Sequence, residues 1–269
     1  MKITCLLENS QEKTHCIAEH GLSLYTETQS HKLLLDFGQT HAMLDNAQIL
    51  GIDLRAVDIA FLSHGHYDHS GSLLAFAEQN PRAKIYMQKN AVEPHFHGER
   101  YIGIDTKIAL LPQVHLLDGN AVIDDELSVF AGISGRRCYP QGNRELEVFR
   151  NHMRIEDDFS HEQCLVITQA DKHYLLSGCA HNGILNILGH FHTIYGGCPD
   201  AVITGFHMMK NAEYTAEEWR IIEETAHELK MIPTKFYSGH CTGLTAFARM
   251  KDIMGDQLEA LHSGESIEV

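Results

Sequence analysis

The sequence predicts an α/β protein in which strands and helices alternate along the chain. Two observations carry this prediction: short apolar runs recur, and most are followed by a segment with helical periodicity. Apolar residues make up 43% of the 269 residues and charged residues 21%, so the chain can bury a substantial core. No segment rich in proline, glycine or serine divides it, and we expect one domain over residues 1–269.

The first half of the chain predicts three strands and two helices. Residues 33–35 form the first strand, which ends at Asp36, and a helix follows from Thr40 to about Leu50, ended by Gly51. A buried strand at 59–62, a helix at 71–77 and a strand at 83–87 come next.

The second half repeats the alternation. Strands are expected at 173–176, 201–203 and 235–237, and helices at 183–194, 215–231 and 243–254. Thr215 and Glu218 form a capping box at the start of the second helix. Residues 133–163 are polar and irregular, and we interpret them as a long loop or insertion.

Histidine is the unusual residue of the composition. There are 20 histidines against 21 lysines and arginines, on a chain with a formal net charge of −15. This acidic balance argues against a nucleic-acid partner bound through phosphate neutralisation and favours cations. Seven cysteines without a CxxC pair, no signal peptide and no long apolar run predict a reduced, cytoplasmic protein without membrane association.

Histidines follow the ends of four predicted strands. Each strand ends in a small residue, and a histidine comes within a few positions: His64, His181, His207 and His240. Strand ends on one edge of a layered α/β fold converge in space, where such folds place their sites. Glycines beside these histidines are expected to let the backbone turn sharply.

The segment His64-x-His66-x-Asp68-His69 carries four potential metal ligands within six residues. In a loop, His64 and His66 can face one metal ion, and Asp68 and His69 a second. His181 and His240 are the natural suppliers of a third imidazole to each. Such sets of nitrogen and oxygen ligands with an open position describe a catalytic metal site, at which water is activated.

This segment, placed after an apolar strand, resembles the signature of the metallo-β-lactamase superfamily, and Leu35-Asp36-Phe37-Gly38 resembles its upstream motif. Residues 177–184, 204–207 and 238–243 resemble the subgroup labelled 7,8-dihydropterin synthase-like. Members of that subgroup are associated with joining a dihydropterin to a ribofuranosylaminobenzene phosphate. The resemblance covers residues 20–245 and implies an αββα sandwich of two mixed sheets flanked by helices, with metals at one edge between the sheets.

The resemblance also implies the ligands of two divalent ions. His64, His66 and His181 would hold the first, and Asp68, His69 and His240 the second, while Asp36 would orient a ligand imidazole or the loop. Many members of the superfamily bridge the two metals with an aspartate, but this sequence has Cys179 at that place, either a thiolate ligand or a buried thiol. Zinc is the expected metal, with iron or manganese as alternatives.

Other residues are candidates for work on the substrate. Asp68 and His207 are the candidate catalytic residues, and Arg136, Arg137 and Lys210 could clamp a phosphate. No predicted strand leads into His95 and His97, and we interpret them as surface or lid residues. His190 and His192 are expected in solvent, and His161 is given no role.

We therefore expect a metal-dependent hydrolase or transferase with a dinuclear site, acting on a small phosphorylated or pterin-like substrate. One alternative is a lactone, thioester or phosphodiester hydrolase on the same centre. Because the bridging carboxylate is missing, a metal-containing binding or sensing module without turnover is a second alternative. The sequence does not indicate an oligomeric state.

Overall fold

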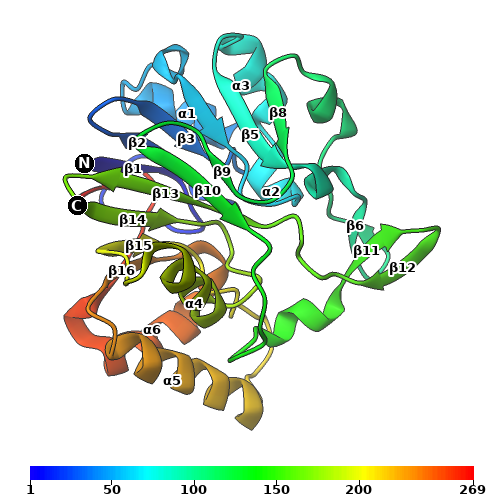
Figure 1. Cartoon of the computed structure of the whole chain (residues 1–269). Coiled ribbons are helices and arrows are strands. Elements are labelled where there is room, and N and C mark those ends of the chain that lie inside the picture. The colour runs from blue at the N-terminus through cyan, green and yellow to red at the C-terminus, as the bar shows by residue number, and fades with distance from the viewer.

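The computed structural model describes all residues from 1 to 269 and contains two seven-stranded mixed sheets packed face to face (Figure 1). The first sheet has the order β18-β1-β2-β3-β4-β5-β8. Its strands are β18 (Ser266–Glu268), β1 (Lys2–Leu7), β2 (Ser23–Glu27), β3 (Lys32–Leu35), β4 (Ile59–Phe61), β5 (Lys84–Gln88) and β8 (Val114–Leu117). From β3 to β8 the strands are parallel.

The second sheet has the order β17-β16-β15-β14-β13-β10-β9. Its strands are β17 (Leu258–Ala260), β16 (Lys235–Ser238), β15 (Ala201–Ile203), β14 (Lys172–Leu176), β13 (Gln163–Gln169), β10 (Leu127–Ala131) and β9 (Ala121–Val122). From β14 to β17 the strands are parallel, and β9, β10 and β13 are antiparallel.

Both faces of each sheet are buried, and side chains alternate between two cores. On β3, Leu33 and Leu35 point into the core between the sheets, whereas Leu34 packs against the helices outside. On β13, Leu165 lies between the sheets and Val166 faces the opposite helices. Two-sided burial explains why these strands are continuous apolar runs in the sequence.

Helices cover the outer faces and complete four layers, so the predicted αββα sandwich is confirmed (Figure 1). On the first sheet lie α1 (Ala42–Ile49) and α3 (Leu73–Gln79), and on the second α4 (Ile184–Tyr195), α5 (Ala216–Lys230) and α6 (Leu244–Met254). A short helix, α2 (Tyr67–Ser70), precedes α3, and the capping box of Thr215 and Glu218 is present. None of the helices combines the length and the apolar character that a membrane span requires.

A small third sheet corrects two of the sequence-based interpretations. It has the order β12-β11-β6-β7, with β12 (Met153–Glu156), β11 (Leu146–Arg150), β6 (His95–His97) and β7 (Arg100–Tyr101), and it projects from one side of the sandwich (Figure 1). Residues 133–163, predicted as a loop or insertion, are therefore not irregular throughout, because they contain β11 and β12, and His95 and His97 do lie on a strand. These strands escape notice because each is short, and because the pairing of β6 with β11, which joins the two hairpins, connects residues about fifty positions apart in the sequence.

Candidate metal centre

The candidate site lies at the edge where β4, β14, β15 and β16 end. The parallel pairing of β14, β15 and β16 brings the segments after them to one place. There Ala180, His207 and His240 adopt left-handed backbone conformations, with φ between 48° and 53°. Non-glycine residues with positive φ cost roughly 1 kcal/mol or more and concentrate at functional sites.

The glycines near these histidines do not make the expected sharp turn but allow close packing of the backbone. Gly178 and Gly205 have no positive φ. A Cβ atom at Gly178 would collide with Ser63 Oγ, and one at Gly205 would collide with Cys241 Sγ. These glycines therefore let the chain ends approach one another closely, while the residues after them make the turn.

Four buried imidazoles are oriented by oxygen acceptors at their Nδ1 atoms. His69 Nδ1 lies 2.6 Å from Asp36 Oδ2, and His64 Nδ1 lies 2.8 Å from Ser63 Oγ, which itself donates to Asp36. The amide oxygens of Asn143 and Asn9 lie 3.0 and 2.8 Å from Nδ1 of His181 and His240. Each Nδ1 therefore carries the proton, and each Nε2 presents a lone pair.

The Nε2 atoms of these four imidazoles face one another in two pairs. Nε2 of His64 lies 3.3 Å from Nε2 of His181, and Nε2 of His69 lies 3.1 Å from Nε2 of His240. Two opposed lone pairs repel, whereas two ligands of one tetrahedral zinc ion are separated by about 3.3 Å at bond lengths of about 2.0–2.1 Å. The donor set therefore fits two divalent cations, one at each pair.

Cys179 lies between the two imidazole pairs. Its Sγ is 3.2 Å from His69 Nε2. It lies within 4.8 Å of a ring nitrogen of His64 and of His181 on one side, and of His69 and of His240 on the other. Burial raises the pKa of this thiol. A bound cation would reverse that preference, because a coordinating thiol loses its proton.

Asp68, predicted as a ligand of the second metal, lies beside the second pair of imidazoles. Its Oδ2 lies 3.4 Å from His240 Nε2, 3.6 Å from His69 Nε2 and 3.1 Å from Nε2 of His20, a residue that sequence reasoning missed. Burial opposes ionisation of this carboxyl group, but these imidazoles outweigh it and hold the pKa of Asp68 well below its ordinary value.

His66 lies beside the first pair. Its ring centroid is 4.6 Å from that of His64 and 4.8 Å from that of His181, so the three imidazoles predicted for the first metal are adjacent. Its buried Nε2 has no hydrogen-bond partner, and His66 also belongs to a second group of side chains, formed with His95, Asp157 and His161. His95 is fully buried, which contradicts its interpretation as a surface or lid residue.

Two glutamates that hold the ligand loops could not be recognised from the sequence. Glu162 is fully buried, and its two oxygens accept the backbone N–H groups of His181 and Asn182. Glu8 accepts those of Asn9, Ser10 and His240 in the same way. Neither glutamate belongs to a motif, and both lie far in the sequence from the histidine that they position.

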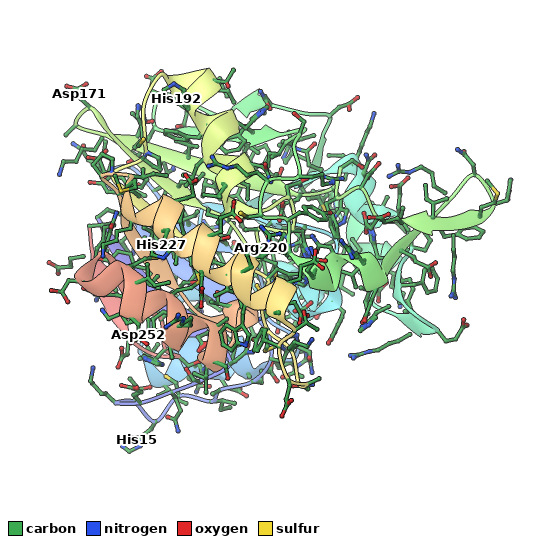
Figure 2. All side chains as sticks on the ribbon, turned by 90° about the horizontal axis from the view of Figure 1, so that it is seen from below. His15, Asp171, His192, Arg220, His227 and Asp252 are labelled. Atoms are coloured by element: carbon green, nitrogen blue, oxygen red, sulfur yellow. The ribbon has the colours of Figure 1, made fainter.

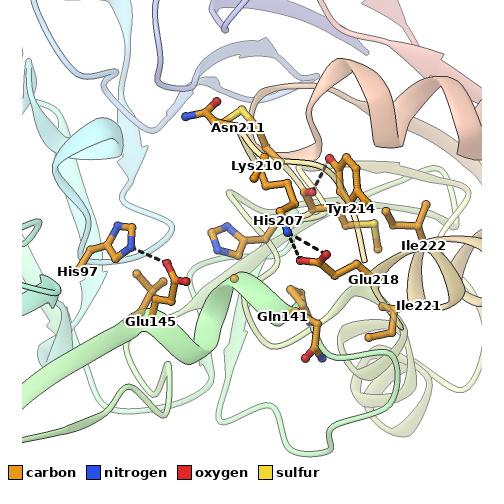
Figure 3. Close-up of a pocket in the computed structure, with 16 residues that line it drawn as sticks. His97, Gln141, Glu145, His207, Lys210, Asn211, Tyr214, Glu218, Ile221 and Ile222 are labelled. Atoms are coloured by element: carbon orange, nitrogen blue, oxygen red, sulfur yellow. Dashed lines mark hydrogen bonds and ion pairs between the residues drawn. The ribbon is translucent and has the colours of Figure 1, made fainter. Parts of the chain in front are cut away.

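His207 separates this buried centre from an open cavity of about 540 Å³ (Figure 3). Its ring centroid lies 4.1 Å from that of His181, and its Nδ1 is buried without a partner. The cavity is also lined by Lys210, which pairs with Glu218 at 2.7 Å, and by His97, which meets Glu145 at 2.8 Å. Apolar walls come from Leu146, Met208, Ile221 and Ile222.

The structure does not bring the two predicted arginines to this cavity. Arg136 stacks its guanidinium on the ring of Tyr139 at 4.3 Å, and Arg137 pairs with Glu228 on α5. Neither lines the cavity, so only Lys210 of the three predicted phosphate ligands does.

Histidines outside the centre lie mostly on the surface. His15, His192 and His227 are exposed on the outside of the molecule (Figure 2). His192 therefore lies in solvent as expected, but His190 does not, because it is half-buried against the ring of Phe130 at 5.4 Å.

Acid should destabilise the metal-free protein. Burial lowers the pKa of His64, His66 and His181, and neighbouring imidazoles lower it further. The unfolded chain therefore binds protons at these residues first, as the pH falls below about 6.5. For His69, the effect of burial is outweighed by Asp36, and the pKa is raised. Its contribution to the free energy of unfolding is therefore present at low pH and lost as the pH rises, so it offsets only part of the destabilisation caused by the other three imidazoles.

Urea unfolding of chelator-treated protein at pH 7.5 and 5.5 checks this expectation, with a lower free energy of unfolding at pH 5.5. His64→Gln should reduce the difference, while the exposed control His227→Gln should keep it. Equal stability at the two pH values in the unaltered chain would show that these imidazoles are not held neutral.

A buried set of imidazoles, a carboxylate and a thiol behind an open cavity is the kind of donor set that can hold a catalytic metal ion. The family model described as the metallo-beta-lactamase superfamily matches residues 19–218, and this chain belongs to that superfamily of fold-related, largely metal-dependent hydrolases. Proteins with this fold bind divalent metals, often zinc.

Relatives and a solved structure cover nearly the whole chain. It is 27% identical to an uncharacterized protein of Methanocaldococcus jannaschii over 260 residues, with 93% of this chain and 94% of the relative covered. It is 28% identical to a 7,8-dihydropterin-6-methyl-4-(beta-D-ribofuranosyl)-aminobenzene-5'-phosphate synthase of the same organism, with 93% and 90% covered. The crystal structure of a metal-dependent hydrolase of the beta-lactamase superfamily matches with a TM-score of 0.84 and 28% identity, covering 100% of this chain and 99% of that one.

Proposed function

We propose that this protein is a hydrolase or transferase that uses two divalent metal ions to activate water against a small-molecule substrate. The observation that supports this most strongly is the two pairs of Nε2 lone pairs, 3.3 and 3.1 Å apart, on either side of Cys179. In this proposal each ion takes three protein ligands of its own, besides the shared Cys179: His64, His66 and His181 for the first, and Asp68, His69 and His240 for the second.

The residues around the centre have separate tasks. When bound, the ions would supply an acidified water near neutral pH and polarise a carbonyl or phosphoryl oxygen. Asp68 is the carboxylate beside the Nε2 atoms of the second pair, and Asp36 fixes the ring of His69 through Nδ1. His207, between the centre and the cavity, is placed to orient the leaving group or give it a proton.

Cys179 takes the place of the bridging carboxylate in this proposal. Its sulfur groups with both imidazole pairs, which is the position that a ligand shared by two ions must have. Thiolate is a good ligand for zinc and a poor one for manganese, so Cys179 favours zinc over manganese.

The cavity supports a small substrate with one anionic and one apolar part. Lys210 is the one lysine or arginine among the lining residues, and Ile221 and Ile222 form an apolar wall. A phosphorylated or pterin-like molecule fits this combination, and the similarity to the archaeal synthase supports the same class. In this binding mode the phosphate would compete with Glu218 for the ammonium group of Lys210.

The Lys210–Glu218 ion pair favours a second candidate, hydrolysis of an uncharged lactone or thioester. A cation already neutralised by a carboxylate at 2.7 Å offers little net charge to an anion. Such a substrate would use the apolar wall and leave the ion pair intact.

Zinc-loaded protein assayed with phosphomonoesters, phosphodiesters, lactones and thioesters tests both candidates, with chelator-treated protein and Asp68→Asn as backgrounds. We expect metal-dependent turnover of at least one class. Lys210→Ala should raise KM about tenfold or more for phosphorylated substrates and leave KM for uncharged ones unchanged. If zinc-loaded protein matches the backgrounds on every class, the chain is a metal-containing binding or sensing module instead of an enzyme.

A further inference from the structure

A second cluster of buried polar side chains adjoins His66 and has no part in the function proposed above. It consists of His95 on β6, Asp157 after β12 and His161 before β13, all fully buried or nearly so. One ligand or acceptor atom from each of these residues and from His66 lies within 4.8 Å of the others. Together with His66, these residues come from three separate segments of the chain, so only the fold assembles them.

The hydrogen bonds of the cluster locate its protons. The backbone N–H of Gly65 donates to His161 Nδ1 at 2.9 Å, so the proton of His161 is on Nε2, which lies 3.3 Å from Asp157 Oδ2. The same oxygen lies 2.7 Å from His95 Nδ1, so His95 is protonated there. Asp157 Oδ1 accepts the N–H of Phe159. Asp157 is therefore a buried anion with three donors and no cationic side chain beside it.

These assignments leave two complementary ring nitrogens. Nε2 of His95 is an acceptor without a donor, and Nε2 of His66 is the other buried ring nitrogen of the cluster without a partner. If His66 binds metal through Nδ1, its Nε2 carries a proton and needs an acceptor. The two rings lie 5.5 Å apart between centroids and nearly perpendicular, at 76°.

We propose that Asp157 and His95 form a carboxylate–imidazole chain that receives the Nε2 proton of His66 and so orients and polarises this metal ligand. The negative charge of Asp157 reaches His66 through the Nδ1–H of His95 and increases electron donation from His66 to the metal. Groups that hold a ligand imidazole in this way typically change metal affinity by about 10–100-fold. His95 and Asp157 are thus positioning residues, and the inference rests on the proposal that His66 is a metal ligand.

Two variants and two matched controls test this chain in the full-length, zinc-loaded protein. Asp157→Asn keeps the size of the side chain and removes its charge, and His95→Phe keeps a ring and removes both hydrogen bonds. Asp158→Asn and His115→Phe are the controls, because Asp158 adjoins Asp157 in sequence and both control residues are exposed. Chelator competition measures the affinity of each of the two metals separately.

We expect Asp157→Asn and His95→Phe each to weaken one metal about 10–100-fold and leave the other unchanged, with both controls at the level of the unaltered chain. A nitrogen–proton NMR correlation spectrum of the unaltered, zinc-loaded protein should show His66 protonated at Nε2, with slow exchange into solvent. This spectrum needs no variant, so it tests the inference even if a substitution prevents folding.

Four results would overturn the inference. Both metals retained at unchanged affinity in the two variants, or His66 protonated at Nδ1, would remove the chain and leave the proposed function intact. A third zinc ion in the unaltered chain that is lost in Asp157→Asn would make the cluster a metal site in its own right. An unaltered chain that binds no metal would remove both this inference and the proposed function.

Discussion

His69→Ala is expected to remove one metal ion and to lower turnover about a thousandfold. His69 Nε2 lies 3.1 Å from His240 Nε2 and 3.2 Å from Cys179 Sγ, so its loss removes a ligand where the second ion and the shared thiol meet. A metal that acts as Lewis acid and activates water is worth several kcal/mol of transition-state stabilisation, and about 4 kcal/mol corresponds to a thousandfold in rate.

Metal analysis after gel filtration measures the loss of the ion. Turnover is measured with whichever substrate class the assay panel described under Proposed function identifies. His227→Ala is the matched control, because His227 is an exposed histidine on α5, remote from the centre (Figure 2). Circular dichroism should show the same secondary structure for both variants. A His69→Ala protein that keeps two metal ions and normal turnover would exclude His69 as a ligand.

Cys179→Ala is expected to weaken the binding of the second metal ion and to lower turnover about a hundredfold, roughly 2.7 kcal/mol of transition-state stabilisation. The expected reason is the loss of the thiolate between the two imidazole pairs, which leaves two cations without a shared anion. Cys179→Asp restores an anionic oxygen ligand and should recover both the second metal and part of the turnover.

Cobalt-substituted protein distinguishes a thiolate ligand from a buried thiol. A sulfur-to-cobalt charge-transfer band in the near ultraviolet is expected in the unaltered chain and should be absent from Cys179→Ala and Cys179→Asp. Cys198→Ala, at an exposed cysteine, should keep the band, and so should Cys241→Ser. If the band disappears only in Cys241→Ser, the ligand is the neighbouring thiol of Cys241.

Six of the fourteen strands of the sandwich, β3, β4, β5, β14, β15 and β16, and five of its helices, α1, α3, α4, α5 and α6, could be predicted because their signals are local. Leu33, Leu34 and Leu35 form an apolar run, and the capping box of Thr215 and Glu218 marks the start of α5 within four residues. The third sheet had no such signal, because β6 and β11 are about fifty residues apart and each buries few side chains. The single domain and the cytoplasmic location stay predictions, although the core between the sheets, which joins strands from both ends of the chain, supports the first.

The candidate ligands could also be predicted, because their spacing reflects local chemistry. His64, His66, Asp68 and His69 are confined to one loop, and a glycine precedes each of the histidines His207 and His240 closely in the sequence. The partners that orient them could not be predicted. Asn9 is hydrogen-bonded to His240, 231 residues away in the sequence, and Asn143 is hydrogen-bonded to His181, 38 residues away. A local sequence pattern contains no information about such long-range partners.

The sequence by itself therefore determined the alternation of strands and helices, the edge at which the site lies and the residue types able to bind metal, since each follows from periodicity or spacing along the chain. The αββα layers were implied by the resemblance of its motifs to the superfamily. The tertiary structure alone decided which nitrogen of each imidazole is free, that Cys179 lies between the two pairs, and that the His95–Asp157 cluster adjoins His66. It also separated Lys210, which faces the cavity, from Arg136 and Arg137, which do not. The physical reason is that hydrogen-bond partners and burial depend on atoms brought together from distant segments, and only the folded chain sets those distances.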